Sequence, residues 1–219
     1  MIHLKRLLRL TKELKHPDAS KRRSAADALS GGDERAIYPL MRALKDENPG
    51  VQDAAMRSLI SLGGEVTAYM VLPLLREDSF LRNTAIIILK EIGLPVVPLL
   101  RPLIKDKDHD VRKFALDLLC DIKHCDYPSE IAFVLESDPN PNVRASAAKA
   151  IGIVQFGEGV TQLIKALQDD EWVCFSALES LALLKDESSI EAVSSLLKSP
   201  SDALRIAAVE TLGSIGTSQ

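Results

Sequence analysis

The stretch "DHDVRKFALDLLCDI" (Asp108–Ile122) decides the fold, because the chain repeats it at nearly constant intervals. Related stretches are "DSFLRNTAIIILKEI" (78–92), "PNPNVRASAAKAIGIV" (139–154) and "SDALRIAAVETLGSI" (201–215). The apolar residue of the "VR" pair serves as an anchor for aligning the copies. Seven anchors follow one another at spacings of 30 to 32 residues: Lys21, Val51, Leu81, Val111, Val143, Val173 and Leu204.

The residues that follow each anchor have helical spacing. Four places after the anchor every copy has alanine: Ala25, Ala55, Ala85, Ala115, Ala147, Ala177 and Ala208. Eight places after it stands leucine or isoleucine: Leu29, Leu59, Leu89, Leu119, Ile151, Leu181 and Leu212. At about 100° per residue, positions 0, 4, 8 and 11 lie in one stripe about 80° wide. Each copy is therefore predicted to be a helix with one buried face, on which alanine permits close approach of a neighbouring helix.

A second apolar segment precedes these helices, as at 37–44, 71–77, 97–104 and 160–167. Each unit is thus predicted to be two helices joined by a short turn containing Asp, Asn or Pro. Prolines 39, 73, 98 and 102 lie near or inside the first helices. An interior proline kinks or ends a helix, so we expect these first helices to be bent or to start late.

A helix pair of about 30 residues with D-x-x-V-R-x-x-A-x-x-x-L-x-x-I-G in its second helix resembles the HEAT-like repeat of the phycobilisome-lyase type. The resemblance implies an all-α fold, a right-handed α-solenoid (superhelix) of about seven HEAT-like helix pairs, because single pairs must stack to bury their apolar faces. We expect one repeat domain over residues 1–219. Its repeats are expected at approximately 2–32, 33–63, 64–93, 94–123, 124–155, 156–185 and 186–216.

Composition places the chain among ordinary globular proteins, with 46% hydrophobic and 26% charged residues. No apolar run reaches the roughly 18–20 residues that span a bilayer, and the N-terminal segment lacks the pattern of a signal peptide. The odd number of cysteines (Cys120, Cys125 and Cys174) favours a reducing compartment over a disulfide scaffold. These features predict a cytoplasmic protein with no membrane partner.

Few side chains suggest catalysis or metal binding. Hydroxylases of the resembling repeat class hold two irons through His-Glu pairs, and none of the four histidines here precedes a glutamate. "CDIKHCD" (Cys120–Asp126) collects thiols, an imidazole and carboxylates, but its spacing fits no zinc pattern. The Gly-Gly pairs at 31–32 and 63–64 lack the other residues of phosphate-binding loops. We therefore expect a protein that is not an enzyme, with no metal site and no cofactor.

An arginine follows the anchor in five copies, and these residues form what we term the arginine ladder: Arg22, Arg82, Arg112, Arg144 and Arg205. We expect each to bridge to an acidic residue of the turn before it, such as Asp78, Asp106, Asp138 or Asp202, since the planar guanidinium suits a carboxylate. The alternative is a row of phosphate-binding groups.

The first 23 residues carry eight basic side chains against Glu13 and Asp18. Leu4, Leu7, Leu8 and Leu14 are predicted to face inward on the opening helix. Lys5, Arg6, Arg9 and Lys12 form a basic end, which we interpret as the polar cap that a solenoid requires. The alternative is an anionic partner at this end.

Positions 2, 6 and 9 after each anchor lie opposite the buried stripe and form what we term the second-helix ridge. In the resembling solenoids the second helices line the concave side, so this ridge is expected to face the groove. It holds five basic and five acidic side chains. A nucleic-acid groove would be biased towards positive charge, so the mixed ridge favours protein or peptide recognition and makes nucleic acid a disfavoured partner.

The candidate partner-binding residues of the ridge include two proposed anchors, Ile60 with Ile87 and, separately, Phe175. The full set is Arg57, Ile60, Asn83, Ile87, Lys90, Lys113, Asp117, Lys149, Phe175, Glu179 and Ile206.

Taken together, these features predict a non-enzymatic protein-interaction scaffold that binds a protein or peptide in the concave groove. One alternative is a subunit of a bilin lyase, which the resemblance implies. Another is a nucleic-acid-binding protein that uses the basic end. Because the last helix carries Ile206, Ala207 and Val209, we also expect the solenoid to continue beyond Gln219 or to be covered there by another molecule.

Overall fold

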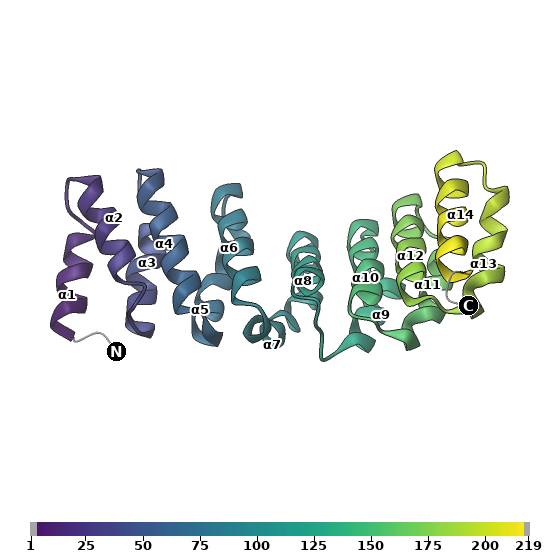
Figure 1. Cartoon of the computed structure of the whole chain (residues 1–219), viewed down its shortest axis with the longest axis horizontal. Coiled ribbons are helices and arrows are strands. Elements are labelled where there is room, and N and C mark those ends of the chain that lie inside the picture. Colours follow the sequence, from purple (N-terminus) through teal and green to yellow (C-terminus); the bar gives the residue numbers. More distant parts are fainter. Residues whose placement is uncertain (1–3, 217–219) are drawn as a thin grey trace. The chain divides into compact units, whose positions relative to one another are not determined.

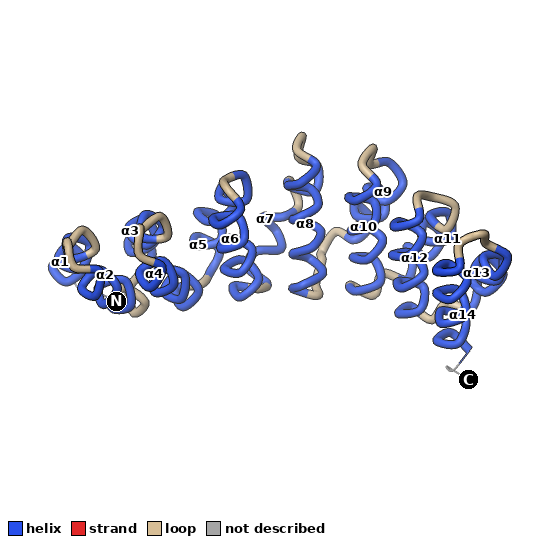
Figure 2. Tube along the Cα trace, turned by 90° about the horizontal axis from the view of Figure 1, so that it is seen from above, coloured by secondary structure: helices blue, strands red, loops and turns tan. Residues whose placement is uncertain are grey.

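A computed structural model describes residues 4–216, and within that range it contains fourteen α-helices, seven short 3₁₀ helices and no strand (Figure 2). The first helices of the pairs are α1 (Leu4–Glu13), α3 (Ile37–Ala43), α5 (Gly64–Val71), α7 (Val97–Leu100), α9 (Pro128–Ser137), α11 (Val160–Ala166) and α13 (Ile190–Ser195). The second helices are α2 (Ala19–Ala28), α4 (Pro49–Leu62), α6 (Ser79–Ile92), α8 (His109–Ile122), α10 (Pro141–Ile153), α12 (Glu171–Leu184) and α14 (Asp202–Gly216).

The 3₁₀ helices lie beside the first helices. They are η1 (Glu34–Ala36), η2 (Leu72–Arg76), η3 (Leu94–Val96), η4 (Leu103–Lys105), η5 (Gly157–Gly159), η6 (Glu187–Ser189) and η7 (Leu196–Lys198).

The helices form two compact units, one up to Leu99 and one from Leu100 onward. Within each unit a first helix packs on the second helix of its own pair, and neighbouring second helices pack on one another. Figure 1 shows α2, α4 and α6 side by side in the first unit and α8, α10, α12 and α14 in the second. The all-α repeat solenoid predicted from the sequence is confirmed, whereas the single domain over 1–219 stays a prediction. Ile2 and Gln219 lie outside the described residues.

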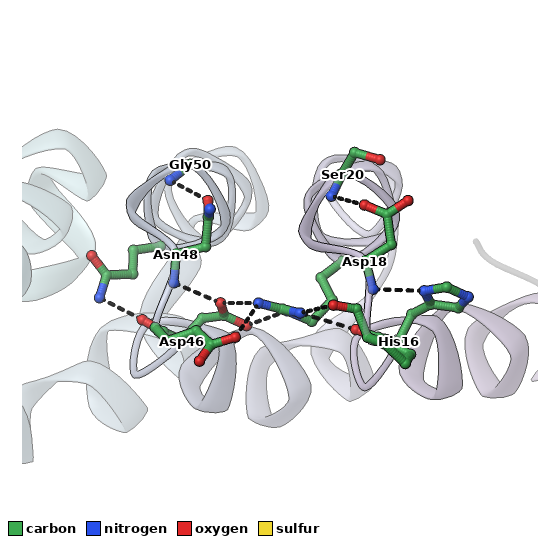
Figure 3. Close-up of polar contacts among 10 residues, drawn as sticks. His16, Asp18, Ser20, Asp46, Asn48 and Gly50 are labelled. Carbon is green, nitrogen blue, oxygen red and sulfur yellow. Dashed lines mark hydrogen bonds and ion pairs between the residues drawn. The ribbon is translucent and has the colours of Figure 1, made fainter.

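Turn residues set where the second helices begin. Asp18, Asn48, Asp108 and Asn140 each accept a hydrogen bond from the backbone N–H two residues later, at 2.8–2.9 Å. Such N-caps satisfy donors that the first turn of a helix leaves unpaired. Figure 3 shows two of these caps, from Ser20 to Asp18 and from Gly50 to Asn48.

The predicted stripe is the core. The alanine four places after the anchor is buried in all seven copies, and the residue eight places after it is fully buried in the first six. Leu212, which holds that position in the last copy, is half-buried. On the opening helix Leu7 and Leu10 are buried, while Leu4 and Leu8 are exposed, so the prediction that Leu4 and Leu8 face inward was wrong.

Three of the four prolines lie where a first helix is interrupted, as predicted. Pro73 lies in η2, where α5 gives way to a 3₁₀ turn, and α7 is only four residues long, with Pro98 inside it and Pro102 just beyond it. Pro39 lies inside α3 without ending it. From α4 onward, each second helix is longer than the first helix of its pair.

Neighbouring second helices approach closely because small residues stand at their contact. The hydroxyl of Ser58 donates to the carbonyl of Ala26 at 2.9 Å, and that of Ser180 donates to Ala148 at 2.8 Å, so each serine links its helix to the preceding repeat. A Cβ built on Gly152 would lie 2.7 Å from the Cα of Ser180. Only glycine fits there without moving α10 from α12.

Among the described residues, no helix combines the length and apolar character needed to cross a membrane.

Replacing Gly152 with alanine should destabilise the protein by about 1–3 kcal/mol, because the added methyl group meets backbone rather than a movable side chain. Gly213 occupies the same repeat position in α14 and has nothing within 4 Å of a built Cβ. Gly213→Ala should therefore stabilise by up to about 1 kcal/mol through helix propensity. Urea denaturation followed by circular dichroism would measure both, and shifts of the same sign would contradict this account.

Candidate interaction surface

The arginine ladder links successive repeats. Nε and Nη2 of Arg22 donate to the two carboxylate oxygens of Asp46 at 2.8 and 2.9 Å, while Nη1 donates to the carbonyls of His16 and Pro17 at 3.0 and 2.9 Å (Figure 3). The guanidinium thus holds the turn of its own repeat and the carboxylate of the next one. Such bidentate pairing is both directional and strong.

Two arginines of the second unit repeat this geometry. Arg112 holds Asp138 at 2.6 and 2.9 Å and donates to the carbonyl of Asp106 at 2.8 Å. Arg144 holds Asp169 at 2.7 and 2.6 Å and donates to the carbonyl of Asp138 at 2.8 Å. Both pairs are largely buried, with 12% and 6% of the Arg112 and Asp138 side chains exposed.

The prediction that the ladder arginines bind carboxylates is confirmed for Arg22, Arg112 and Arg144, but the predicted position of those carboxylates in the preceding turn was wrong. We expected each arginine to bind an acidic side chain of the preceding turn, whereas that turn supplies backbone carbonyls and the carboxylate comes from the following repeat. Arg82 accordingly donates to the carbonyl of Glu77, and Asp78 caps α6 by accepting from Leu81 N–H at 3.0 Å. Arg205 does pair as expected, with the exposed Asp202 ahead of it.

Two copies lack the arginine. Gln52 still donates to the carbonyl of Asp46 at 2.7 Å, and the following turn contains Glu77, which pairs with Lys45 at 3.4 Å. Cys174 is buried, and the following turn has Ser199 and Pro200 where other repeats have the aspartate. The acidic partner is therefore absent after Cys174 but not after Gln52.

Part of the first-unit ridge forms ion pairs. Arg57 pairs with Asp53 and, across the repeat boundary, with Asp27 at 3.1 Å. Asn83 and Lys90 are exposed on α6, Ile60 is half-buried, and Ile87 is 45% exposed. Ile87 is therefore surplus to the core, as the sequence predicted.

In the second unit, part of the ridge is likewise paired. Lys113 donates to Asp117 at 2.6 Å, and the other oxygen of Asp117 accepts from Ser146 at 2.9 Å. Lys149 is exposed. Two other members of the ridge, Cys120 and Gly152, are buried, so position 9 faces solvent in only some repeats.

Three candidate residues of the second unit lie together. Phe175, Glu179 and Ile206 border one solvent-open groove of about 670 Å³ between α12 and α14, hereafter the α12–α14 groove. Ile206 is 60% exposed, and Leu183 adds a further exposed apolar side chain. The sequence analysis missed Leu183, which lies outside the ridge, and it placed Glu210 on the ridge but not among the candidate binding residues, although both line this groove.

The cysteines lack the environment of reactive thiols. Burial raises the pKa of Cys120 to about 12 and that of Cys174 to about 11, so both thiols are protonated at neutral pH. His124 contacts Asp126 at 2.9 Å. Within residues 4–216, no group of three or more His, Cys, Asp or Glu side chains is arranged to hold a metal ion.

The basic end is exposed to solvent. Lys5, Arg6, Arg9 and Lys12 are all exposed on α1, and Arg9 lies 3.5 Å from Glu13. Its two predicted roles, a polar cap and a site for an anionic partner, both stay predictions.

A family model for HEAT repeats matches residues 7–90 and 160–219, which together make up more than half of the chain. The chain belongs to the HEAT-repeat family. A model for the PBS lyase HEAT-like repeat matches residues 143–169 of this HEAT-repeat protein. No curated protein matches the sequence.

Solved structures share the fold at low identity. An engineered protein is 20% identical with a TM-score of 0.55, and the match covers 96% of this chain and 68% of the other. The complex of CpcE and CpcF of phycocyanin lyase from Nostoc sp. PCC7120 is 19% identical with a TM-score of 0.59, over 66% of this chain and 96% of the other. These likenesses establish the HEAT-repeat architecture alone.

Replacing Arg112 with alanine should lower the free energy of unfolding by roughly 2–3 kcal/mol, because it leaves the buried Asp138 carboxylate without its partner. Arg205→Ala is the matched control, since its partner Asp202 is 84% exposed and the loss should stay below about 1 kcal/mol. Denaturant titration measures both. Equal losses would show that the ladder does not act through buried pairs.

Stability should also depend on Asp169 through pH. The hydrogen bonds from Arg144 hold the pKa of Asp169 below its usual value, so this pair stabilises the fold above the unfolded pKa. The contribution is lost as pH falls through the folded pKa. The Tm difference between wild type and Asp169→Asn should therefore shrink as pH is lowered from about 5 to about 2. A difference that stays constant over this range would contradict the linkage.

Proposed function

We propose that this HEAT-repeat chain is a non-enzymatic scaffold that binds another protein or a peptide along its second-helix ridge. One observation carries the proposal: Phe175, Glu179 and Ile206, selected from sequence periodicity, border the α12–α14 groove. A ridge residue that is large, apolar and surplus to the core is the kind of side chain that anchors protein interfaces.

The rest of the ridge supports the same role. Its paired charges around Arg57 and Lys113 give a mixed, nearly neutral surface, which suits the polar rim of a protein interface better than a phosphate backbone. The exposed Ile87 supplies a second apolar point on α6.

Changing Ile87 and Phe175 together to serine should weaken partner binding by about 2–4 kcal/mol, because the substitutions remove both proposed apolar anchors. The tagged wild-type chain and the double variant would be used to capture proteins from the native cell, with mass spectrometry quantifying each. Proteins enriched on the wild type should be lost from the variant. The melting temperature of the variant is the control, and an unfolded variant that still binds would place the site elsewhere.

A bilin-lyase subunit is the second candidate. It is favoured by the PBS lyase HEAT-like repeat at residues 143–169 and by the likeness to the phycocyanin lyase complex of CpcE and CpcF. In this case a partner subunit would complete the site. Incubation with a free bilin, followed by a visible spectrum after gel filtration, distinguishes the candidates: colour that comigrates with the protein supports the lyase role.

A further inference from the structure

The α12–α14 groove combines apolar side chains with two acidic ones. Phe175, Leu183 and Ile206 supply apolar surface, while Glu179 from α12 and Glu210 from α14 line the same groove. Both glutamates are exposed, and no lysine or arginine lines the groove with them.

Unlike other carboxylates of the ridge, these two have no ion-pair partner among the described residues. Asp27 pairs with Arg57, and Asp117 pairs with Lys113. Lys149 occupies the repeat position of Glu179 one repeat earlier, yet no ion pair joins the two. The groove thus keeps two uncompensated negative charges.

The surrounding charge has the same sign. Residues 170–216 contain eight acidic side chains and three basic ones, Lys185, Lys198 and Arg205. Arg205 is itself engaged with Asp202. A negative field of this kind steers and holds cations.

The two glutamates lie at position 6 of the ridge, where Arg57, Ile87 and Lys149 are also exposed. Ile206 lies at position 2, where Asp53 of the first unit is exposed but Lys113, Ala145 and Phe175 of the second unit are half-buried. Exposure at position 6 therefore recurs in repeats that have neighbours on both sides, whereas exposure at position 2 varies.

We propose that the α12–α14 groove binds a cationic peptide segment of another protein, with a lysine or arginine facing Glu179 and Glu210 and an adjacent apolar side chain against Phe175 and Ile206. This inference rests on the proposed function and specifies its ligand. Trp172 is 74% exposed and its ring lies 6.2 Å from that of Phe175, which extends the aromatic surface beside the groove. Aromatic faces also attract cations.

The test begins with a phage-displayed library of random twelve-residue peptides, selected against the purified chain in low salt. Selected sequences are synthesised with a fluorescein label, and their Kd values are measured by fluorescence anisotropy. The selected peptides should carry basic residues next to apolar ones. Glu179→Gln with Glu210→Gln should raise Kd at least tenfold.

The matched control is Glu158→Gln with Glu187→Gln, which removes two exposed carboxylates outside the groove and should change Kd less than twofold. Thermal melts check that both double variants stay folded. Phe175→Ser with Ile206→Ser should also abolish binding if the apolar side chains form the floor.

The possible failures are distinguishable. Two results would overturn the cationic ligand and leave the proposed scaffold intact. In one, the selected peptides bind more weakly to the serine variant but bind the glutamine variant with unchanged Kd. In the other, the selected peptides lack basic residues. A library that yields no binder would overturn the cationic peptide ligand, while the capture experiment with the Ile87 and Phe175 serine variant tests the proposed scaffold separately. Light scattering on the chain alone tests for self-association. If the wild type self-associates and the glutamine variant does not, the groove is occupied by a second copy of the chain, and the inference is overturned.

Discussion

Stacking of one repeat on the next is the constraint on which the structure depends, and Arg22, Arg112 and Arg144 of the arginine ladder give that stacking direction. A single HEAT pair cannot bury both faces of its helices, so its stability comes from its neighbours. Apolar packing supplies most of that energy but is not directional. The guanidinium of Arg112 adds direction, because one nitrogen holds the carbonyl of Asp106 and the other two hold the carboxylate of Asp138 in the next repeat. Each link therefore fixes the turn of one repeat relative to the next.

Small residues at the opposite side of the contact complete this constraint. Gly152 lets α10 approach Ser180, whose hydroxyl then reaches the carbonyl of Ala148. With the turns joined by arginine and the helices joined by serine, the buried stripe and its flanks are fully committed to structure. The ridge is less constrained: Gly152 belongs to it and is fixed by packing, whereas exposed members such as Lys149 and Glu179 differ between repeats.

The sequence predicted the fold well, because the repeat spacing and the alanine four places after each anchor are local signals that recur in seven copies. It was less reliable wherever the answer depended on a neighbouring repeat. The aspartate partners were placed in the wrong turn. Asp138 is close in sequence to Arg144, yet its carboxylate binds Arg112 of the preceding repeat, and Arg144 binds only its backbone carbonyl. Leu4 and Leu8 were placed inward because a leucine-rich helix offers two adjacent stripes, and only packing on α2 selects Leu7 and Leu10.

The groove shows the same dependence on neighbours. Phe175, Ile206 and Glu210 lie on the ridge by periodicity, yet the participation of Leu183 follows only from how α14 lies on α12. The fold also explains why such a groove can carry unpaired glutamates. An exposed carboxylate remains hydrated and costs folding little, whereas a buried one such as Asp138 requires a bidentate partner. A ligand that covers Glu179 and Glu210 removes that hydration, so an apolar ligand without a compensating cation would be disfavoured. Under the proposed function, the unpaired charges of the groove would act on the choice of partner, while the buried ion pairs of the ladder stabilise the fold.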